Sequence, residues 1–440
     1  METRSYDVLV VGGGGAGVTA AASAAQAGAR VAILSKEPVG CGNTRIARGG
    51  FAGVGFVPGD SPGEFFRDML AGGEGLGQPG LIQTLTQEAL QAVSVAEGLG
   101  HIFRRDPEGE IKGSAVGRPA GHHFSRTVSS PAQGVSLGGV LHGAAFRSKV
   151  DLLEETVAFQ LLGRDRVRGL MAFSLRDGRV MALTARAVVL ACGGAGWLYY
   201  PHTDCVRSSA GDGFALALEG GAELMGMEFM QFLPFAVTHP ASYAGIFLGE
   251  PSVAGPQGRL VNGQGQTVLT DMMTMTRAQV ARVVALEIAA GNATDYGGLS
   301  LDLSPNLETP QGRDAWRKLT GIGVLDQAQA IYGQGAFRWE EPWDVAPTAH
   351  FSAGGVRIDA GCRASLEGLY AAGEVAGGVH GADRLGGTSL TEVFLFGWKA
   401  GRRRQPMPWA RVPLRPTPRK LGARPRGWRP FSAEGGNTAP

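Results

Sequence analysis

The chain has 440 residues, of which 18% are charged and 44% hydrophobic, so it can build a large core and is not a disordered protein. Glycine accounts for 70 residues, about twice the usual share, and no triplet repeat accompanies it, which excludes a collagen. The last forty residues hold ten Lys and Arg against one acid, whereas the other 400 hold 31 bases and 38 acids. The main body is therefore mildly acidic, which argues against a general nucleic-acid binder.

Cysteine and histidine positions give no sign of a disulfide framework or a metal site. The four cysteines form no C-x-x-C pair, and the eight histidines show no zinc-ligand spacing. No signal peptide precedes the first predicted strand, and no stretch is long and apolar enough to cross a bilayer. We therefore expect a cytoplasmic protein with reduced thiols, no metal and no transmembrane segment.

The first predicted elements are a strand, a helix and a second strand. Asp7–Val11 is an unbroken aliphatic run, typical of a strand buried in a parallel sheet. Val18–Ala29 is a helix of small residues, and Arg30–Leu34 is the next strand. Together they predict a βαβ unit.

Further elements follow along the chain, and two changes of composition interrupt them. Helices are predicted over 81–99, 214–219, 277–290 and 388–400, strands over 187–191 and 368–372, and a hairpin joins 167–173 to 180–183. Ser389-x-x-Glu392 predicts a capping box at the last helix. Residues 228–348 are richer in Pro, Gly and Met, which predicts an inserted second domain. Residues 402–430 are dense in Arg and Pro, and we expect them to be disordered.

Between the first strand and the first helix lies a G-x-G-x-x-G motif. Gly12 permits a tight turn, Gly14 lets a pyrophosphate approach the backbone, and Gly17 lets the helix pack on the strand. The phosphates would lie at the helix N-terminus, where free N–H groups face them. Because the motif sits inside a βαβ unit, it predicts a dinucleotide site. The acid expected after the second strand is replaced by Ser35 and Lys36.

Six ordered motifs extend this prediction to a family. The segments VVGGGGAG, LSKEPVGCGNTRIARGG, MEFMQFLP, PTAHFSAGGV, LYAAGEVAGG and HGADRLGGTSLTEVFLFG resemble the fumarate reductase/succinate dehydrogenase flavoprotein family, which includes L-aspartate oxidase. The resemblance covers residues 5 to about 401 and suits a divergent member. It implies an α/β fold: a discontinuous Rossmann-like FAD-binding domain (1–226 and 349–401) with an inserted α+β capping domain (227–348). The family's C-terminal helical domain is expected to be absent, with a basic Pro-rich tail over 402–440.

The resemblance also assigns residues to FAD. It places the pyrophosphate at the glycine turn, the flavin along Thr44, Gly49 and Gly50, the ribityl chain at Glu374 and the pyrimidine edge at the start of the last helix. Covalent members carry a histidine where this chain has Asn43, so we expect non-covalent FAD. The residues predicted to bind FAD are Gly12, Gly14, Gly15, Ala16, Gly17, Ser35, Lys36, Asn43, Thr44, Gly49, Gly50, Glu374, Ser389 and Leu390.

The family's dicarboxylate site is kept in part. His350 and Arg384 match two substrate anchors and are the predicted catalytic residues, although a core histidine and a surface salt bridge of Arg384 with Asp383 are the plainer readings. Leu233 stands where the family has a histidine. Ala254 stands where we place the family's proton-shuttling arginine, and the sequence leaves open whether Arg259 or Arg277 replaces it. Plain fumarate reduction is therefore doubtful, and a less charged substrate, such as a monocarboxylate or an apolar enone or alkane, is the hypothesis.

The expected activity is an FAD-dependent oxidoreductase acting on a CH–CH bond, with hydride transfer between flavin N5 and a small substrate. Electrons would pass to or from an iron–sulfur protein, a quinone or oxygen. Two alternatives remain: an L-aspartate oxidase-like activity, and a flavin-binding subunit without its own turnover. The basic tail is either a genuine segment that binds nucleic acid or acidic membranes, or the product of truncation or a shifted reading frame.

Overall fold

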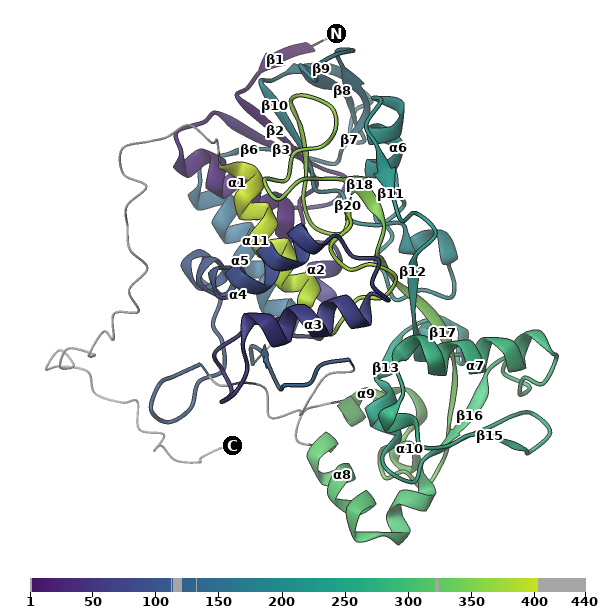
Figure 1. Ribbon diagram of the computed structural model, residues 1–440. Helices are drawn as coiled ribbons and strands as arrows, with labels where there is room; N and C mark the ends of the chain where they lie inside the picture. Colours follow the sequence, from purple (N-terminus) through teal and green to yellow (C-terminus); the bar gives the residue numbers. More distant parts are fainter. Residues whose placement is uncertain (1, 112, 114–120, 132, 321–323, 403–440) are drawn as a thin grey trace, which may run out of the picture. The chain divides into compact units, whose positions relative to one another are not determined.

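A five-stranded parallel sheet lies at the centre of the part of the fold that contains the glycine motif (Figure 1). The computed structural model describes residues 2–111, 113, 121–131, 133–320 and 324–402. Within it, β2, α1 and β3 form the predicted βαβ unit, in which β2 pairs in parallel with both β3 and β10. The strand order is β19 (Leu369–Ala371), β10 (Ala187–Leu190), β2 (Val8–Val11), β3 (Val31–Ser35) and β6 (Asp151–Glu154). The central strands are aliphatic and buried, and α1 packs against β2, β3 and β10.

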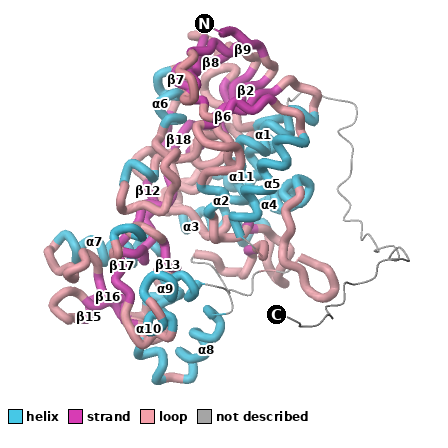
Figure 2. The backbone as a smooth tube through the Cα atoms, turned by 180° about the vertical axis from the view of Figure 1, so that it is seen from behind, coloured by secondary structure: helices cyan, strands magenta, loops and turns pink. Residues whose placement is uncertain are grey.

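A second sheet of four strands packs near the N-terminus (Figure 2). It contains the predicted hairpin, now β8 and β9, which pair antiparallel. Its order is β1 (Glu2–Ser5), β9 (Val180–Thr184), β8 (Gly169–Ser174) and β7 (Thr156–Leu162). The remaining elements of this half are α2 (Asn43–Ile46), β4 (Phe51–Ala52), α3 (Pro62–Gly72), α4 (Pro79–Leu99), β5 (Thr127–Val128), α5 (Gln133–Arg147), α6 (Asp212–Glu219), β11 (Leu224–Met225), β18 (Gly355–Arg357) and β20 (Ala376–Gly377).

Helices α1 (Gly15–Gln26) and α11 (Thr388–Gly401) lie side by side and parallel, although more than 360 residues separate them (Figure 1). Gly397 faces the carbonyl of Ala16 and Gly401 faces the carbonyl of Ala20, so the absence of side chains at these glycines allows the close approach. By these pairings α11 begins about two turns before α1, so its N-terminus lies roughly 12 Å further back, on the N-terminal side of α1. Two helix N-termini therefore point the same way at different heights.

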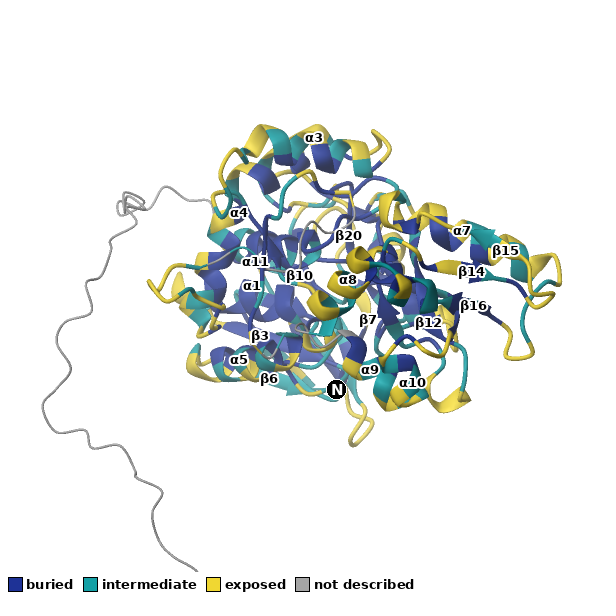
Figure 3. Cartoon of the chain, turned by 90° about the horizontal axis from the view of Figure 1, so that it is seen from below, coloured by how far each residue is buried: buried dark blue, intermediate teal, exposed yellow. Residues whose placement is uncertain are grey.

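Residues 230–352 contain a six-stranded antiparallel sheet with its own hydrophobic core. Figure 3 shows buried residues along α1 and α11 and exposed faces on α3 and α8. The sheet order is β13 (Phe247–Gly249), β12 (Met230–Val237), β17 (Trp343–Ser352), β16 (Leu299–Asp302), β14 (Arg259–Val261) and β15 (Thr267–Leu269), with helices α7 (Arg277–Ala289), α8 (Pro310–Thr320), α9 (Val324–Tyr332) and α10 (Gln334–Phe337). The predicted domain boundaries at 226 and 349 stay a prediction.

Two local predictions were wrong. Helix α1 begins at Gly15 rather than Val18, because the end of the glycine motif is already its first turn. The capping box at Ser389 is absent: Gly387 is the N-cap of α11 without a side-chain bond, and Glu392 instead accepts a 2.8 Å hydrogen bond from Nε2 of His380. A capping box does occur on α7, between Thr276 and Gln279.

Some expectations lie outside the described residues. The predicted basic tail and the predicted loss of a helical C-terminal domain concern residues beyond 402. None of the described helices combines the length and the hydrophobicity that crossing a bilayer requires. All four cysteines are free thiols.

Candidate functional site

The three motif glycines have different surroundings. A Cβ at Gly12, whose φ is +121°, would collide with the carbonyl of Ala191, and a Cβ at Gly17 would collide with the carbonyl of Gly12. A Cβ at Gly14 would meet no atom closer than 4.0 Å. Two glycines are thus required by the protein's own packing, whereas the space in front of Gly14 is left for a ligand.

The N-terminus of α1 is open to such a ligand. Gly14 is the N-cap and offers no side chain to the helix. The N–H of Gly15 donates to Oγ1 of Thr44 at 3.2 Å, and Ala16 and Gly17 continue the first turn. Uncapped N–H groups and the positive end of the helix dipole favour a diphosphate at this position.

The end of β3 carries polar groups, and the acid that follows it, Glu37, accepts a 3.2 Å hydrogen bond from Oγ of Ser208. Ser35 lies against Gly13, and Lys36 forms an ion pair with Asp212, the first residue of α6. Glu154, at the end of the neighbouring strand β6, accepts a 2.7 Å hydrogen bond from the N–H of Val39. The charge of Lys36 is therefore neutralised within the protein, which leaves Ser35 the predicted residue best placed for a ribose.

Glu374 and Asn43 join distant parts of the chain. Glu374 is buried and accepts hydrogen bonds from the N–H of Ser352 at 3.0 Å and from Nδ2 of Asn43 at 3.2 Å. Asn43 in turn accepts from the N–H of Val206 at 2.9 Å. Burial raises the pKa of Glu374, although these bonds and the charges of His350 and Arg384 act in the opposite direction. A buried carboxyl of this kind favours hydrogen-bond donors such as ribityl hydroxyl groups.

The start of α11 provides the second open helix end. Gly387 caps it without a side-chain bond, Ser389 is partly exposed and Leu390 is buried. A Cβ at Gly15 would collide with Val393 of α11, so this helix and the glycine motif are adjacent. The carbonyl of Val128 blocks any side chain at Gly50, whereas Gly49 is exposed. The spacing of the two helix ends suits an elongated cofactor with a diphosphate at one end.

His350 is held by an acid that the sequence did not reveal. Its Nδ1 donates to both carboxylate oxygens of Asp204, at 2.8 and 3.0 Å. Because a carboxylate can only accept, Nδ1 carries a proton and Nε2 is the nitrogen left for a ligand. The side chain is 30% exposed, so His350 is not a fully buried core histidine.

Arg384 is buried and makes no ion pair with any residue that the structure describes. Only 5% of the residue is exposed, its guanidinium lies 5.0 Å from the centre of the Phe351 ring, and its Nη1 donates to the carbonyl of Leu385 at 2.9 Å. Its Nε is buried and has no hydrogen-bond partner among the described residues. Burial, and then the charge of Arg277, lower the pKa of Arg384 to about 10. The plainer reading of Arg384 as a surface salt bridge with Asp383 is therefore wrong, since Asp383 accepts from Gln231 instead.

Arg277, and not Arg259, is the second arginine of this region. Its Nε donates to Glu250 at 2.6 Å and its Nη1 donates to the carbonyl of Arg384 at 3.0 Å. Burial alone would lower the pKa of Arg277, but the ion pair with Glu250 offsets this and raises it. Arg259 is exposed and pairs with Asp302, and Ala254 lies fully buried in the second core.

The residues of this region influence one another electrostatically. Burial would raise the pKa of Glu250, but Arg277, then Arg384 and His350, lower it. Gln231 fixes the segment by donating to the carbonyl of Arg384 at 2.8 Å, and its own Oε1 is buried without a partner among the described residues. Oε1 of Gln231 and Nε of Arg384 are thus two buried polar atoms that can form a hydrogen bond with a polar ligand or water.

Sequence reasoning missed Asp204, Glu250 and Gln231. Asp204 lies 146 positions from His350, and Glu250 lies 27 positions from Arg277, with no motif connecting them. Only Gln231 lay in a quoted motif, MEFMQFLP, where the missing histidine drew attention to Leu233. Leu233 itself is 1% exposed and pairs with Thr348 in the sheet.

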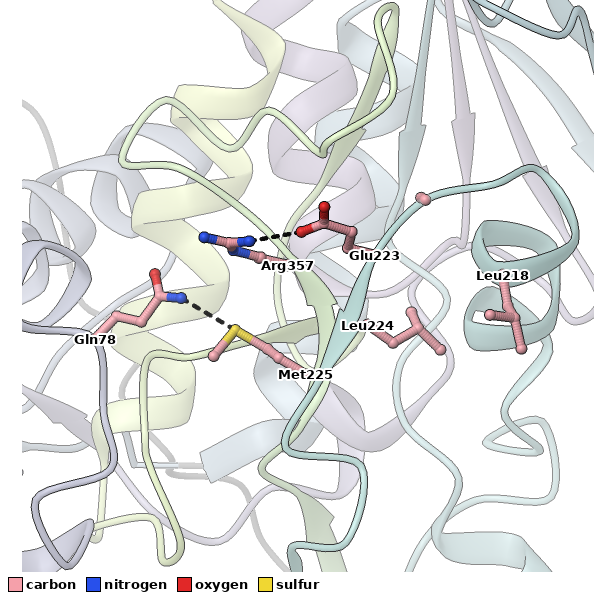
Figure 4. Close-up of a pocket in the computed structure, with 7 residues that line it drawn as sticks. Gln78, Leu218, Glu223, Leu224, Met225 and Arg357 are labelled. Atoms are coloured by element: carbon pink, nitrogen blue, oxygen red, sulfur yellow. Dashed lines mark hydrogen bonds and ion pairs between the residues drawn. The ribbon is translucent and has the colours of Figure 1, made fainter.

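A groove of about 630 Å³ lies elsewhere and shares no residue with the predicted site (Figure 4). Its walls are apolar apart from a 2.6 Å ion pair between Arg357 and Glu223, and Nε2 of Gln78 reaches Sδ of Met225. The described residues gather no His, Cys, Asp and Glu cluster suited to a metal ion. His122 is buried, donates to the carbonyl of Gly386 at 2.8 Å, and has a pKa lowered by burial to about 4.

Comparisons with known proteins agree with this geometry. The family model described as FAD binding domain matches residues 7–390. One of the subunits of the fumarate reductase (CoM/CoB) of Methanothermobacter marburgensis is 36% identical, over 91% of this chain and 73% of that protein. L-aspartate oxidase of Streptomyces coelicolor is 33% identical, over 89% and 67%. A solved structure of Escherichia coli quinol fumarate reductase has a TM-score of 0.78 at 30% identity, covering 91% of this chain and 70% of that one.

These matches extend over both open helix ends and the His350–Arg384 region. They have the sequence identity and the coverage that establish membership rather than fold alone. The chain therefore belongs to the fumarate reductase/succinate dehydrogenase flavoprotein family, with L-aspartate oxidase among its relatives, and it is an oxidoreductase whose cofactor is FAD.

Proposed function

We propose that the protein transfers a hydride between N5 of FAD and a carbon atom of a small carboxylate-bearing substrate. The observation that carries the proposal is the guanidinium of Arg384, which is buried, has no acidic partner and leaves Nε unbonded among the described residues. A buried cation without an anion is costly unless a ligand supplies one. Bound FAD would supply the two-electron chemistry, and the protein supplies binding and orientation.

Arg384 and His350 would hold the carboxylate. The free Nε of Arg384 donates one hydrogen bond, and Nε2 of His350 faces the ligand because Asp204 occupies Nδ1. Asp204 fixes the tautomer and stabilises the imidazolium when Nε2 is protonated. The carbonyl of Arg384 is held by Gln231 and Arg277, which limits the movement of this segment when a ligand binds.

The second carbon of a reduced double bond needs a proton. Arg277 and Glu250 form the proton-bearing pair that contacts Arg384 directly. The Arg277 side chain is 5% exposed, whereas the Glu250 side chain is 28% exposed. In the proposed step Arg277 would give a proton to the substrate carbon, and Glu250, which is bonded to its Nη2, would return a proton taken from solvent.

A single-turnover reaction tests the proposal. FAD-loaded protein is reduced under anaerobic conditions and mixed with an α,β-unsaturated carboxylate or with its methyl ester, and flavin absorbance is followed. We expect reoxidation by the acid to be about 100-fold faster than by the ester, because the ester lacks the charge that Arg384 recognises. Equal rates for acid and ester would contradict the role of Arg384 and favour an apolar enone.

L-aspartate oxidation is the second candidate, favoured by the similarity to L-aspartate oxidases along most of the chain. Its carboxylate would use the same two residues. Flavin reduction by L-aspartate, followed by release of hydrogen peroxide in air, would decide for it. Reduction by a saturated dicarboxylate without a response to aspartate would decide against it.

Electron exchange with a partner is also a proposal. One similar protein is named as part of a multi-subunit fumarate reductase, and another as a quinol fumarate reductase. By analogy we propose a further protein chain or a quinone as the electron partner here, and oxygen if the aspartate candidate holds. Steady-state turnover with each acceptor in separate assays distinguishes them.

A further inference from the structure

Arg48 is a cation of this region that neither the motifs nor the proposed reaction has used. It follows the short helix α2 and precedes Gly49, in the segment predicted to run along the flavin. Its Nη1 donates to the carbonyl of Phe247 at 2.8 Å, and Phe247 is the first residue of β13. Arg48 thus reaches from the glycine-rich half of the fold to the sheet that carries His350.

Independent contacts place Arg48 beside His350. The ring of Phe247 lies 6.3 Å from the ring of His350, measured between centres. Asp204, which binds His350, is also the acid that acts electrostatically on Arg48. Solvent reaches the Arg48 side chain, yet enough protein surrounds the guanidinium for burial to lower its pKa.

The cations of the region fall into two kinds. Arg277 and His350 each have a carboxylate partner, Glu250 and Asp204. Arg48 and Arg384 have only backbone carbonyls as partners among the described residues, and neither makes an ion pair within 4.0 Å there. Among the described residues, the buried guanidinium of Arg384 and the exposed guanidinium of Arg48 therefore both lack an anion. A ligand with two anionic groups would satisfy both, whereas a ligand with one would leave Arg48 without a partner.

We propose that Arg48 is a specificity-determining residue that binds the second carboxylate of a short dicarboxylate whose first carboxylate is held by Arg384. This inference rests on the proposed function and refines its substrate class. It reverses the expectation drawn from Leu233, because the positive charge missing at that position would be supplied by Arg48, in the segment between α2 and β4. The substrate is then a dicarboxylate rather than a monocarboxylate or an apolar enone.

Ligand binding to the oxidised, FAD-loaded protein tests this without turnover. Succinate and butyrate have the same carbon chain but differ by one carboxylate, and each is titrated while the flavin absorbance change is recorded. The variants are Arg48→Gln, Arg48→Lys and, as a matched control, Arg45→Gln, which removes the same charge from an exposed arginine three residues away. The FAD content of every variant is measured first, and the flavin midpoint potential is recorded without ligand.

We expect Arg48→Gln to weaken succinate binding by about 10- to 100-fold and to change butyrate binding less than about threefold. Arg48→Lys should recover part of the succinate affinity, and Arg45→Gln should change neither ligand. Equal losses for the two ligands would overturn the proposal and assign Arg48 to holding Phe247. A lowered midpoint potential with unchanged succinate affinity would overturn it by assigning the charge to the flavin.

The outcome also separates this inference from the proposed function. If butyrate and succinate bind equally and Arg48→Gln has no effect, Arg48 is not an anchor but a carboxylate site at Arg384 stands. If the unsubstituted protein binds neither ligand, both the anchor and the carboxylate site are refuted.

Discussion

The proposed FAD site around the glycine motif (the cofactor cradle) and the proposed carboxylate site around Arg384 and His350 (the anion site) are built from different kinds of residue. The cradle around Gly12, Gly14 and Gly17 presents backbone N–H groups, and its specificity comes from the absence of side chains. The site around Arg384 and His350 presents buried charges, each held by a partner from elsewhere in the chain. The proposed cradle would bind through fixed dipoles at two helix ends. The proposed anion site would bind through Arg384, which has no ion-pair partner among the described residues, and through His350, which Asp204 holds.

This difference predicts different costs of substitution. A side chain added to the cradle collides either with the protein's own backbone, which lowers stability, or with the ligand only, which lowers ligand affinity. A charge removed from the anion site changes ligand affinity and leaves its buried partner uncompensated. The predictions below test this contrast, beginning with the largest expected effect.

Gly17→Ala and Gly14→Ala separate packing from ligand space. We expect Gly17→Ala to lower the free energy of unfolding by about 3 kcal/mol without FAD, because its Cβ collides with the carbonyl of Gly12. Gly14→Ala should unfold like the unsubstituted apoprotein, since its backbone suits alanine and nothing lies within 4.0 Å, yet it should lose FAD affinity. Chemical denaturation of apoprotein and FAD titration measure the two effects, with Gly80→Ala as control. Equal destabilisation by both variants would refute the contrast.

Arg384→Gln should slow single-turnover reoxidation of reduced flavin by an unsaturated carboxylate about 100-fold, which corresponds to about 2.7 kcal/mol. The cause is the loss of the only described guanidinium with a buried, unpartnered Nε. Its FAD content should not change, since no predicted FAD contact is removed. Stopped-flow absorbance gives the rate, and an unchanged rate would exclude Arg384 from substrate binding.

Glu250→Gln should lower the free energy of unfolding by about 2 kcal/mol, because it leaves the buried charge of Arg277 without its partner. The double variant Glu250→Gln/Arg277→Gln should recover part of this loss. As a matched control, Glu223→Gln breaks the exposed pair with Arg357 and should cost at most about 0.5 kcal/mol. A Glu250 effect no larger than that of Glu223 would show that the pair is not buried in solution.

The smallest effect concerns pH. Burial lowers the pKa of His122 to about 4, below its ordinary value of 6.5, so the unfolded chain binds a proton that the folded protein refuses. Stability from this group is complete above pH 6.5 and is lost as the pH falls towards 4, by about 1 kcal/mol between pH 7 and 5.5. Denaturation of His122→Gln over this range should show a flatter pH dependence, and an unchanged slope would assign the effect to other groups, such as His101.

The cradle was predictable because its residues are local. A strand, a glycine motif and a helix follow one another within thirty residues, and their sterics can be argued from the residue types alone. The helix boundary was wrong by three residues because the end of the glycine motif is itself the first helical turn. The capping box failed because Glu392 has a better partner, the buried His380, which lies outside the local sequence window.

The anion site was predictable only in part. The resemblance supplied His350 and Arg384, but the residues that hold them come from separate elements. Asp204 follows β10 by more than a dozen residues, and Arg277 begins α7 in another layer. The contacts of Asp204 with His350 and of Arg277 with Arg384 depend on how β17 and the segment before α11 pack together. The periodicity of a single sequence carries no information about such packing between distant segments. The same reason hid Arg48, whose partner is a backbone carbonyl 199 residues away.

A structure of the FAD-loaded protein with succinate bound tests the central claim most directly. The account predicts the diphosphate in front of Gly14, one carboxylate hydrogen-bonded to Nε of Arg384 and to His350, and the other on Arg48. A diphosphate elsewhere, or a bound succinate that leaves Nε of Arg384 without a partner, would contradict it.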